Sequence, residues 1–240
     1  MYIDFDRNEE IFKSFNVRIA DRDKEYSIKF SNKDVNHQRQ CLMVEHNFNR
    51  EELHSLINQL YLPQSFQNFV LNILHSNLDQ NIFDLYLGRD KDNDRIYIGM
   101  PLKAMGYRLE QKNNKLSQNK YLSLDAEEFK QYIEDILKQC FPNNYSEIYL
   151  NLLSNIGELI CDYRRFVKLD SNLAKTFYIG LKDSKIKNNI DHISNIVNII
   201  TNKDINIIKG FLEEVADYDL SMLGISNDFS ATIYYRKLLG

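Results

Sequence analysis

The sequence predicts an α+β fold in which an antiparallel β-barrel or strongly curved sheet is surrounded by an outer layer of paired amphipathic helices. Short segments with alternating apolar residues are joined in pairs by polar turns, as in β-hairpins. Between them lie longer segments, also in pairs, whose apolar residues recur at helical spacing. This alternation of hairpins and helix pairs, with a period of roughly 70 residues, indicates a repeated unit of structure.

The composition favours a single cytoplasmic domain spanning residues 1–240. A hydrophobic content of 43% is enough to bury a core, and no stretch rich in Gly, Pro or Ser divides the chain. A net charge of −4 argues against nucleic acid or an anionic membrane as a partner. No segment has the roughly 18 consecutive apolar residues of a membrane span. The three cysteines show no paired spacing, which predicts reduced thiols.

The first half of the chain is expected to contain two hairpins around one helix pair. Strands are predicted at 26–30, 41–48, 83–88, 95–100, 107–111 and 121–124. Asn49 and Glu52 form a capping-box pattern that starts a helix, and a second helix follows Pro63. The polar segment 90–94 is interpreted as a hairpin turn, because it lacks the central Gly and final Glu of an EF-hand loop.

The second half repeats this order. Asp125 and Glu128 start another capped helix, and Pro142 precedes a long helix that is expected to end at Arg164 and Arg165. A strand at 175–182 leads into a third helix pair within 190–215. Strands at 219–226 and 230–237 form the final hairpin, which makes eight or nine strands in all.

The face of the sheet opposite the helices is predicted to combine cations with tyrosines. Side chains alternate across a strand, so apolar residues that face the helices place their neighbours on the other side. The residues placed there are Lys29, Asp84, Tyr86, Arg95, Tyr97, Tyr178, Lys182, Tyr234 and Arg236, with Glu45 as a further acid. On an open sheet this is a solvated face, whereas in a closed barrel it becomes a basic, aromatic cavity.

Such a cavity suits an anionic diphosphate that carries an apolar or cation-forming group. Lys and Arg bind phosphate oxygens, while the negative faces of tyrosine rings stabilise a developing carbocation. A carboxylate then accepts the departing proton. These residue types therefore predict transfer of an allylic group.

Two segments, 85–97 and 222–236, resemble hairpins of the ABBA-type aromatic prenyltransferases, most closely the cyanobacterial peptide-modifying branch. The resemblance implies a ten-stranded barrel built from α-β-β-α units. It also implies transfer of a prenyl group from its diphosphate to an aromatic or peptide acceptor, with no cofactor or with Mg²⁺ assistance.

By position, the resemblance makes Arg95 and Tyr97 a basic and aromatic pair and Tyr234 a second shielding ring. Lys29 is a diphosphate contact and Glu45 the acceptor-side catalytic base. Thr232 stands where the family pattern has Lys or Arg. The remaining predicted substrate-binding residues are Tyr178, Lys182 and Arg236.

No metal site is predicted, because the five histidines show no ligand spacing. Nucleotide-binding glycine motifs are absent from the sequence. The alternative function is a non-catalytic module whose face rich in Tyr and Arg binds a peptide or protein.

Overall fold

The computed structural model describes residues 2–21, 24–31, 33–90, 93–103, 105–159, 161–170 and 173–236. Within these residues the chain forms seven α-helices and eleven β-strands. Contacts within the chain define two compact units. The first comprises Met1–Lys24 and Arg39–Leu122, and the second comprises Glu25–Gln38 and Ser123–Gly240.

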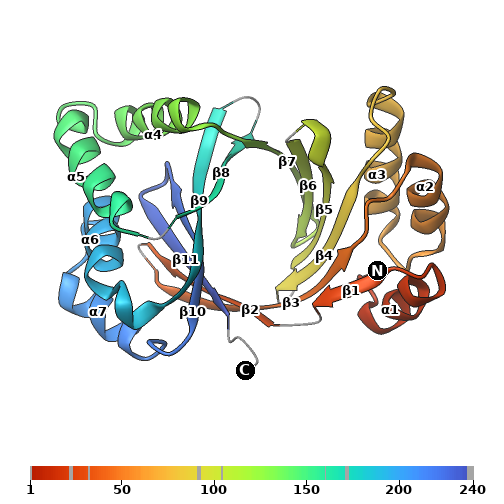
Figure 1. Cartoon of the computed structure of the whole chain (residues 1–240), viewed down its shortest axis with the longest axis horizontal. Helices are drawn as coiled ribbons and strands as arrows, with labels where there is room; N and C mark the ends of the chain where they lie inside the picture. The colour runs from red at the N-terminus through yellow and green to blue at the C-terminus, as the bar shows by residue number, and fades with distance from the viewer. Residues whose placement is uncertain are drawn as a thin grey trace. The chain divides into compact units, whose positions relative to one another are not determined.

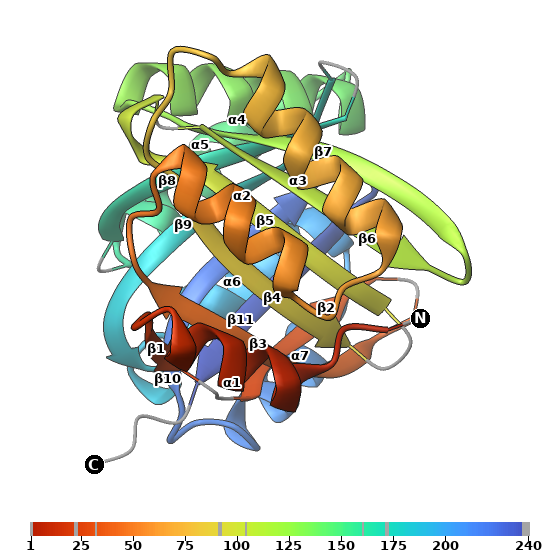
Figure 2. The same cartoon turned by 90° about the vertical axis from the view of Figure 1, so that its right-hand side faces the viewer.

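The first unit contains an antiparallel sheet with the strand order β1-β3-β4-β5-β6-β7. Its elements are α1 (Phe5–Ser14), β1 (Arg18–Asp21), β3 (Val35–Glu45), α2 (Arg50–Gln59), α3 (Gln64–Ser76), β4 (Asp84–Asp90), β5 (Asn93–Met100), the 3₁₀ turn η1 (Pro101–Lys103), β6 (Met105–Lys112) and β7 (Lys115–Ser123). Helices α2 and α3 lie over one face of β4 and β5 (Figures 1 and 2).

The core of this unit forms between those helices and the sheet. From β5 it takes Ile96, Ile98 and Met100, each fully buried. The apolar residues of α2 and α3 recur at helical spacing and complete the same cluster. The alternate residues of β5 therefore lie on the sheet face opposite the helices, which we call the second face.

The second unit contains an antiparallel sheet with the order β2-β11-β10-β9-β8. Its elements are β2 (Lys24–Phe30), α4 (Ala126–Cys140), α5 (Tyr145–Gly157), β8 (Cys161–Asp170), β9 (Leu173–Lys185), the 3₁₀ turn η2 (Ile186–Asn188), α6 (Ile190–Thr201), α7 (Ile205–Glu213), β10 (Asp219–Ser226) and β11 (Ser230–Arg236). Helix α4 packs against β8 and β9, and α6 packs against β11 (Figure 1).

The alternation predicted for the second unit is also observed. The Phe177 ring of β9 meets Phe129 of α4 edge-on, and Phe30 of β2 meets Phe211 of α7 in the same way. Ile233 of β11 is fully buried. The residues between these apolar positions lie on the second face of this sheet.

The helix starts agree with the sequence prediction. Asn49 caps α2 and Asp125 caps α4, and in both cases the glutamate at the third helical position completes a capping box. Helix α3 follows Pro63, and the final hairpin consists of β10 and β11 at the predicted positions.

One prediction about an element was wrong, and two N-terminal elements were missed. Helix α5 ends at Gly157, so Arg164 and Arg165 belong to strand β8 and not to the end of a helix. In β8, alternate residues Val167 and Leu169 are buried, which is a strand pattern. The N-terminal elements α1 and β1 were not predicted. With β1 and β8, the described residues contain more strands than expected.

The predicted fold class is confirmed: the chain is α+β, with a strongly curved antiparallel sheet and paired amphipathic helices on one face of it. No helix in the described part of the chain has both the length and the apolar character needed for a membrane span. That the whole chain is a single domain stays a prediction.

Candidate functional site

The second face of the first unit carries its polar side chains in rows across the sheet. One row runs from Asp84 on β4 through Gly99 on β5 and Gly106 on β6 to Tyr121 on β7. In the next row Tyr86 lies opposite Tyr97, which in turn lies opposite Arg108; in the third row Arg95 lies opposite Glu110. Strand register therefore brings two carboxylates, tyrosines and two arginines to the same face.

A pocket of about 800 Å³ opens on this face. It lies within the first unit, and its lining residues are Val44, His46, Asn47, Asp84, Leu85, Tyr86, Tyr97 and Gly99. This volume falls within the usual range for small-molecule sites. The described lining residues include one carboxylate, two tyrosines and a histidine, and neither Lys nor Arg.

Glycines keep part of this face clear of side chains. Gly99 lies opposite Gly106, so two adjacent positions between Asp84 and Tyr121 have no side chain. A Cβ atom at Gly99 would have Asp84 as its nearest neighbour, at an ordinary contact distance of 3.5 Å. An alanine is therefore sterically tolerated at position 99, whereas a longer side chain would extend into the pocket.

Tyrosine rings form one wall of the pocket. The Tyr86 and Tyr97 rings meet edge-on, with centroids 4.9 Å apart and an interplanar angle of 87°. The ring centroids of Tyr121 and Tyr97 lie 6.1 Å apart, and the Arg108 guanidinium lies 5.3 Å from the Tyr97 ring centroid. The Tyr97 ring therefore already interacts with a cation.

The acidic group of the pocket is Asp84. Its side chain reaches solvent, but the surrounding protein removes part of the water from the carboxylate, and this desolvation raises the pKa of Asp84. The His46 ring packs against Phe48 at an interplanar angle of 57°, and its Nε2 lies 3.6 Å from a Glu52 carboxylate oxygen. Asp84 is thus the one carboxylate among the described residues that line the pocket.

Next to the pocket lies a buried ionic cluster around Glu110. The carboxylate accepts hydrogen bonds from Asn93, Arg95 and Arg108, the Arg95 Nε distance being 3.3 Å. Burial by itself would raise the pKa of Glu110, but Arg108 and Arg95 outweigh it and, with Asn93, lower that pKa to about 2. An Asp90 carboxylate oxygen also lies 3.9 Å from Arg95 Nη2.

One guanidinium nitrogen and one amide oxygen of this cluster are buried without a hydrogen-bond partner among the described residues. The Arg95 side chain is only 8% exposed, and its Nη1 has no hydrogen-bond partner among the described residues. The same holds for Asn93 Oδ1. Because an unpaired buried polar atom costs free energy, Arg95 Nη1 is a candidate contact for a ligand oxygen.

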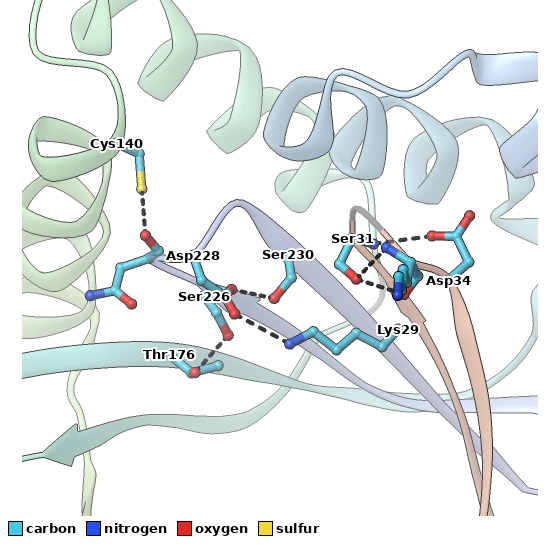
Figure 3. Close-up of polar contacts among 10 residues, drawn as sticks. Lys29, Ser31, Asp34, Cys140, Thr176, Ser226, Asp228 and Ser230 are labelled. Atoms are coloured by element: carbon cyan, nitrogen blue, oxygen red, sulfur yellow. Dashed lines mark hydrogen bonds and ion pairs between the residues drawn. The ribbon is translucent and has the colours of Figure 1, made fainter.

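The second unit brings hydroxyl groups and one ion pair to the hairpin end of β10 and β11 (Figure 3). Lys29 Nζ lies 3.3 Å from the Asp228 carboxylate, which also accepts a hydrogen bond from Ser230. Burial opposes ionisation of Asp228, but the Ser230 hydrogen bond and Lys29 outweigh it and lower the pKa. Nearby, the hydroxyls of Thr176 and Ser226 lie 2.7 Å apart.

Aromatic rings lie beside this group on β8, β9 and β11. Tyr178 packs against Phe166 and Tyr234, with centroid distances of 5.5 and 6.3 Å. Gly224 makes room for the Tyr178 ring, because a Cβ atom at position 224 would lie 2.9 Å from it. Thr232 lies opposite both Gly224 and Lys29.

The predicted site residues belong to both units. Arg95 and Tyr97 lie together in the first unit, next to the pocket. Lys29, Tyr178, Tyr234 and Arg236 belong to the second unit, where Arg236 is exposed at the end of β11. The side chains of Glu45 and Lys182 lie outside the described residues.

Sequence reasoning missed the acids that engage the predicted cations. Glu110 and Asp228 bind Arg95 and Lys29, yet neither was singled out. Glu110 lies on the second face of a predicted strand, so its alternation with Leu109 was a usable signal. Asp84 was placed on the correct face but was not proposed as the base.

In comparisons with known proteins, no family model, no curated protein and no solved structure matches this chain. Within the described ranges, no three His, Cys, Asp or Glu residues are grouped so that they could hold a metal ion.

Proposed function

We propose that this protein is a transferase that moves an allylic prenyl group from its diphosphate to an aromatic or peptide acceptor. The observation that supports it is the order of groups along the second face of β4 and β5. Arg95, Tyr97 and Gly99 follow one another at alternate positions of β5, and Asp84 lies opposite Gly99. A diphosphate contact, a cation shield and an acceptor pocket with a base thus lie in line.

The spacing of these groups suits the reaction. Arg95 and Gly99 are four residues apart on one strand, which corresponds to roughly 13 Å at about 3.3 Å per residue. In the proposal Arg95 Nη1 contacts a diphosphate oxygen and the allylic carbons lie over Tyr97. The acceptor occupies the space above Gly99.

The chemical step then needs no group beyond these. The allylic carbon–oxygen bond breaks, and its electron pair leaves with the diphosphate. The acceptor forms the new bond to the allylic carbon while its proton passes to Asp84, whose raised pKa suits a proton acceptor. The tyrosine rings stabilise the positive charge that develops between these events. No step runs through Mg²⁺ or another cofactor.

The test is a calorimetric titration with a non-hydrolysable dimethylallyl thiolodiphosphate. We expect saturable binding that Arg95→Gln weakens about tenfold or more, the scale of a lost charged hydrogen bond. Glu110→Gln removes the carboxylate that competes for Arg95, so it should strengthen binding. Arg7→Gln changes an exposed arginine of α1 and serves as the matched control.

Two results would contradict the proposal: no saturable binding of the analogue, or the same affinity in Arg95→Gln and wild type. If the analogue binds, Asp84→Asn should retain that binding and lose turnover in a screen of tyrosine and tryptophan peptides. Glu45→Gln in the same screen tests the base that the resemblance implies.

A second candidate function, a non-catalytic module that binds a peptide or protein, is favoured by one observation. The cations assigned to the diphosphate already contact carboxylates, Lys29 with Asp228 and Arg95 with Glu110. Tyrosine-rich faces without excess positive charge suit protein recognition better than diphosphate binding. Failure of the titration above, in protein that is folded, would favour this candidate.

The remaining parts of the proposal follow from composition. We place the protein in the cytoplasm, with neither nucleic acid nor membrane as a partner. Its net charge of −4 provides no general attraction for either polyanionic surface.

A further inference from the structure

The pocket on the second face of the first unit combines a carboxylate, two aromatic rings and an empty position. Asp84 and Tyr86 alternate along β4, and Gly99 and Tyr97 lie directly opposite them on β5. Three corners of this four-residue square therefore carry a carboxylate or a tyrosine, and the fourth has no side chain. The space above Gly99 is bordered by negative charge and by the π-systems of two rings.

We propose that this pocket binds an organic cation, an ammonium or guanidinium group, in the space above Gly99. The inference deepens the proposed function, because it names the acceptor handle that the same pocket would recognise. Only the ligand's role as acceptor rests on the proposed function. Binding of the cation itself requires neither the diphosphate nor the transfer reaction.

The charges around the pocket support a cation over an anion. Asp84 is the one carboxylate among the described lining residues, and these include neither Lys nor Arg. His46 in turn faces the Glu52 carboxylate across 3.6 Å. The Arg108 guanidinium contacts the Tyr97 ring, which forms part of the pocket wall. It donates hydrogen bonds to the Glu110 carboxylate and, over 2.9 Å, to the Tyr121 hydroxyl. An incoming cation therefore meets one carboxylate, that of Asp84, which forms no ion pair with a Lys or Arg among the described residues.

The size of the pocket indicates that the cation belongs to a larger ligand. About 800 Å³ exceeds what one ammonium or guanidinium group fills. Gly99 and Gly106 together leave a gap two strands wide, roughly 10 Å at the usual strand separation. A lysine or arginine side chain of a peptide would place its cation at Asp84 and the rest of the peptide along this gap.

The test measures charge selectivity in the wild-type protein, so it does not depend on a variant folding. Choline is titrated by NMR against 3,3-dimethylbutan-1-ol, a neutral molecule of nearly the same shape. We expect saturable binding of choline that is about tenfold or more tighter than that of the alcohol. Equal affinities, or no binding of choline, would overturn the proposal.

Variants then locate the site. Asp84→Asn should weaken choline binding about tenfold, and Gly99→Leu should abolish it by filling the space. Gly99→Ala, which meets no close neighbour, should fold normally and reduce binding less than Gly99→Leu. Asp79→Asn, which changes an exposed acid paired with Lys103, is the matched control and should leave binding unchanged. Unchanged binding in Asp84→Asn would place the cation elsewhere and refute the assignment.

A third titration distinguishes a peptide ligand from a small quaternary ammonium compound. N-acetyl-arginine amide and N-acetyl-lysine amide should bind more tightly than choline if the cation is a peptide side chain. The reverse order would indicate a small quaternary ammonium compound. If the protein binds choline but not the diphosphate analogue, only the transferase proposal is disproved. If it binds the analogue but not choline, only the cation site is disproved.

Discussion

Glu110 shows how single residues set the electrostatics of the second face. Its carboxylate is largely shielded from water and accepts hydrogen bonds from two arginines and an asparagine. These interactions favour the ionised form despite burial. Removing one partner of such a group leaves charge that nothing compensates. The predicted diphosphate contact Arg95 therefore also has a structural role.

This arrangement predicts a pH-dependent stability. The pKa of Glu110 is lowered from 4.5 to about 2 on folding, so its contribution is fully present above pH 4.5 and is lost as the pH falls towards 2. Glu110→Gln should cost on the order of 3 kcal/mol at pH 7. Urea denaturation from pH 7 to pH 2 should show the two proteins converging as Glu110 becomes protonated.

The control for this prediction is Glu127→Gln, which changes an exposed glutamate of α4. Its unfolding free energy should stay close to that of wild type at every pH. If the Glu110→Gln and wild-type curves run parallel down to pH 2, the ionic cluster does not stabilise the fold as described.

Two glycines give opposite predictions for the same substitution. At Gly224 an added Cβ would lie 2.9 Å from the buried Tyr178 ring, so Gly224→Ala should destabilise by about 1–3 kcal/mol. At Gly210, inside helix α7, an added Cβ meets nothing within 4 Å. Gly210→Ala should therefore stabilise by up to about 1 kcal/mol, the helix propensity difference. Thermal denaturation of both variants checks the signs, and equal signs would contradict the packing at Gly224.

At the scale of elements, the helix starts depend on side chains that are local in sequence. Asn49 and Asp125 each accept a hydrogen bond from the backbone at the third helical position, and the side chains of Glu52 and Glu128 each accept one from the backbone N–H of the capping residue. Helix α5 begins at Tyr145, and its N-cap residue Asn144 makes no side-chain cap hydrogen bond. The three helices therefore differ in how much their first turn depends on one residue.

Alanine substitutions should reproduce that difference. Asn49→Ala and Asp125→Ala should each lower the free energy of unfolding by about 1 kcal/mol. Asn144→Ala, at a helix start without a cap hydrogen bond, should change it by much less. Denaturant titration of the three variants measures this, and an equal loss at all three positions would rule out the caps as the cause.

At the scale of the whole molecule, the chain path joins the two compact units. The segment Glu25–Gln38 of the second unit lies between two segments of the first, and strand β3 contains residues of both. Neither unit is therefore one continuous stretch of chain. A single cooperative unfolding transition is expected, as for one domain.

Native-state hydrogen exchange tests this expectation. A destabilising change in the first unit, Asn49→Ala, should accelerate exchange of the most protected amides in β10 and β11 of the second unit by the same free energy. Asp125→Ala, within the second unit, provides the reference shift for those amides. Unchanged rates in β10 and β11 with Asn49→Ala would mean that the units unfold separately.

The features that the sequence determined by itself are local ones. The α+β class, the starts of α2 and α4, the final hairpin and the face on which Arg95, Tyr97 and Asp84 lie all follow from short-range spacing. Alternation with a period of two places a side chain whatever strand lies next to it. Capping likewise involves residues only three positions apart.

Only the tertiary structure decided features that depend on distant segments. Leu159 fits a helical pattern with the residues before it, but pairing with β9 makes Cys161–Asp170 strand β8. Arg95 and Glu110 are fifteen residues apart, and Lys29 and Asp228 are 199 apart. Strand register sets which charges neutralise each other and which residues lie opposite Gly99 in the pocket. Short-range spacing does not determine register, because it depends on free energies of contact between segments far apart in the chain.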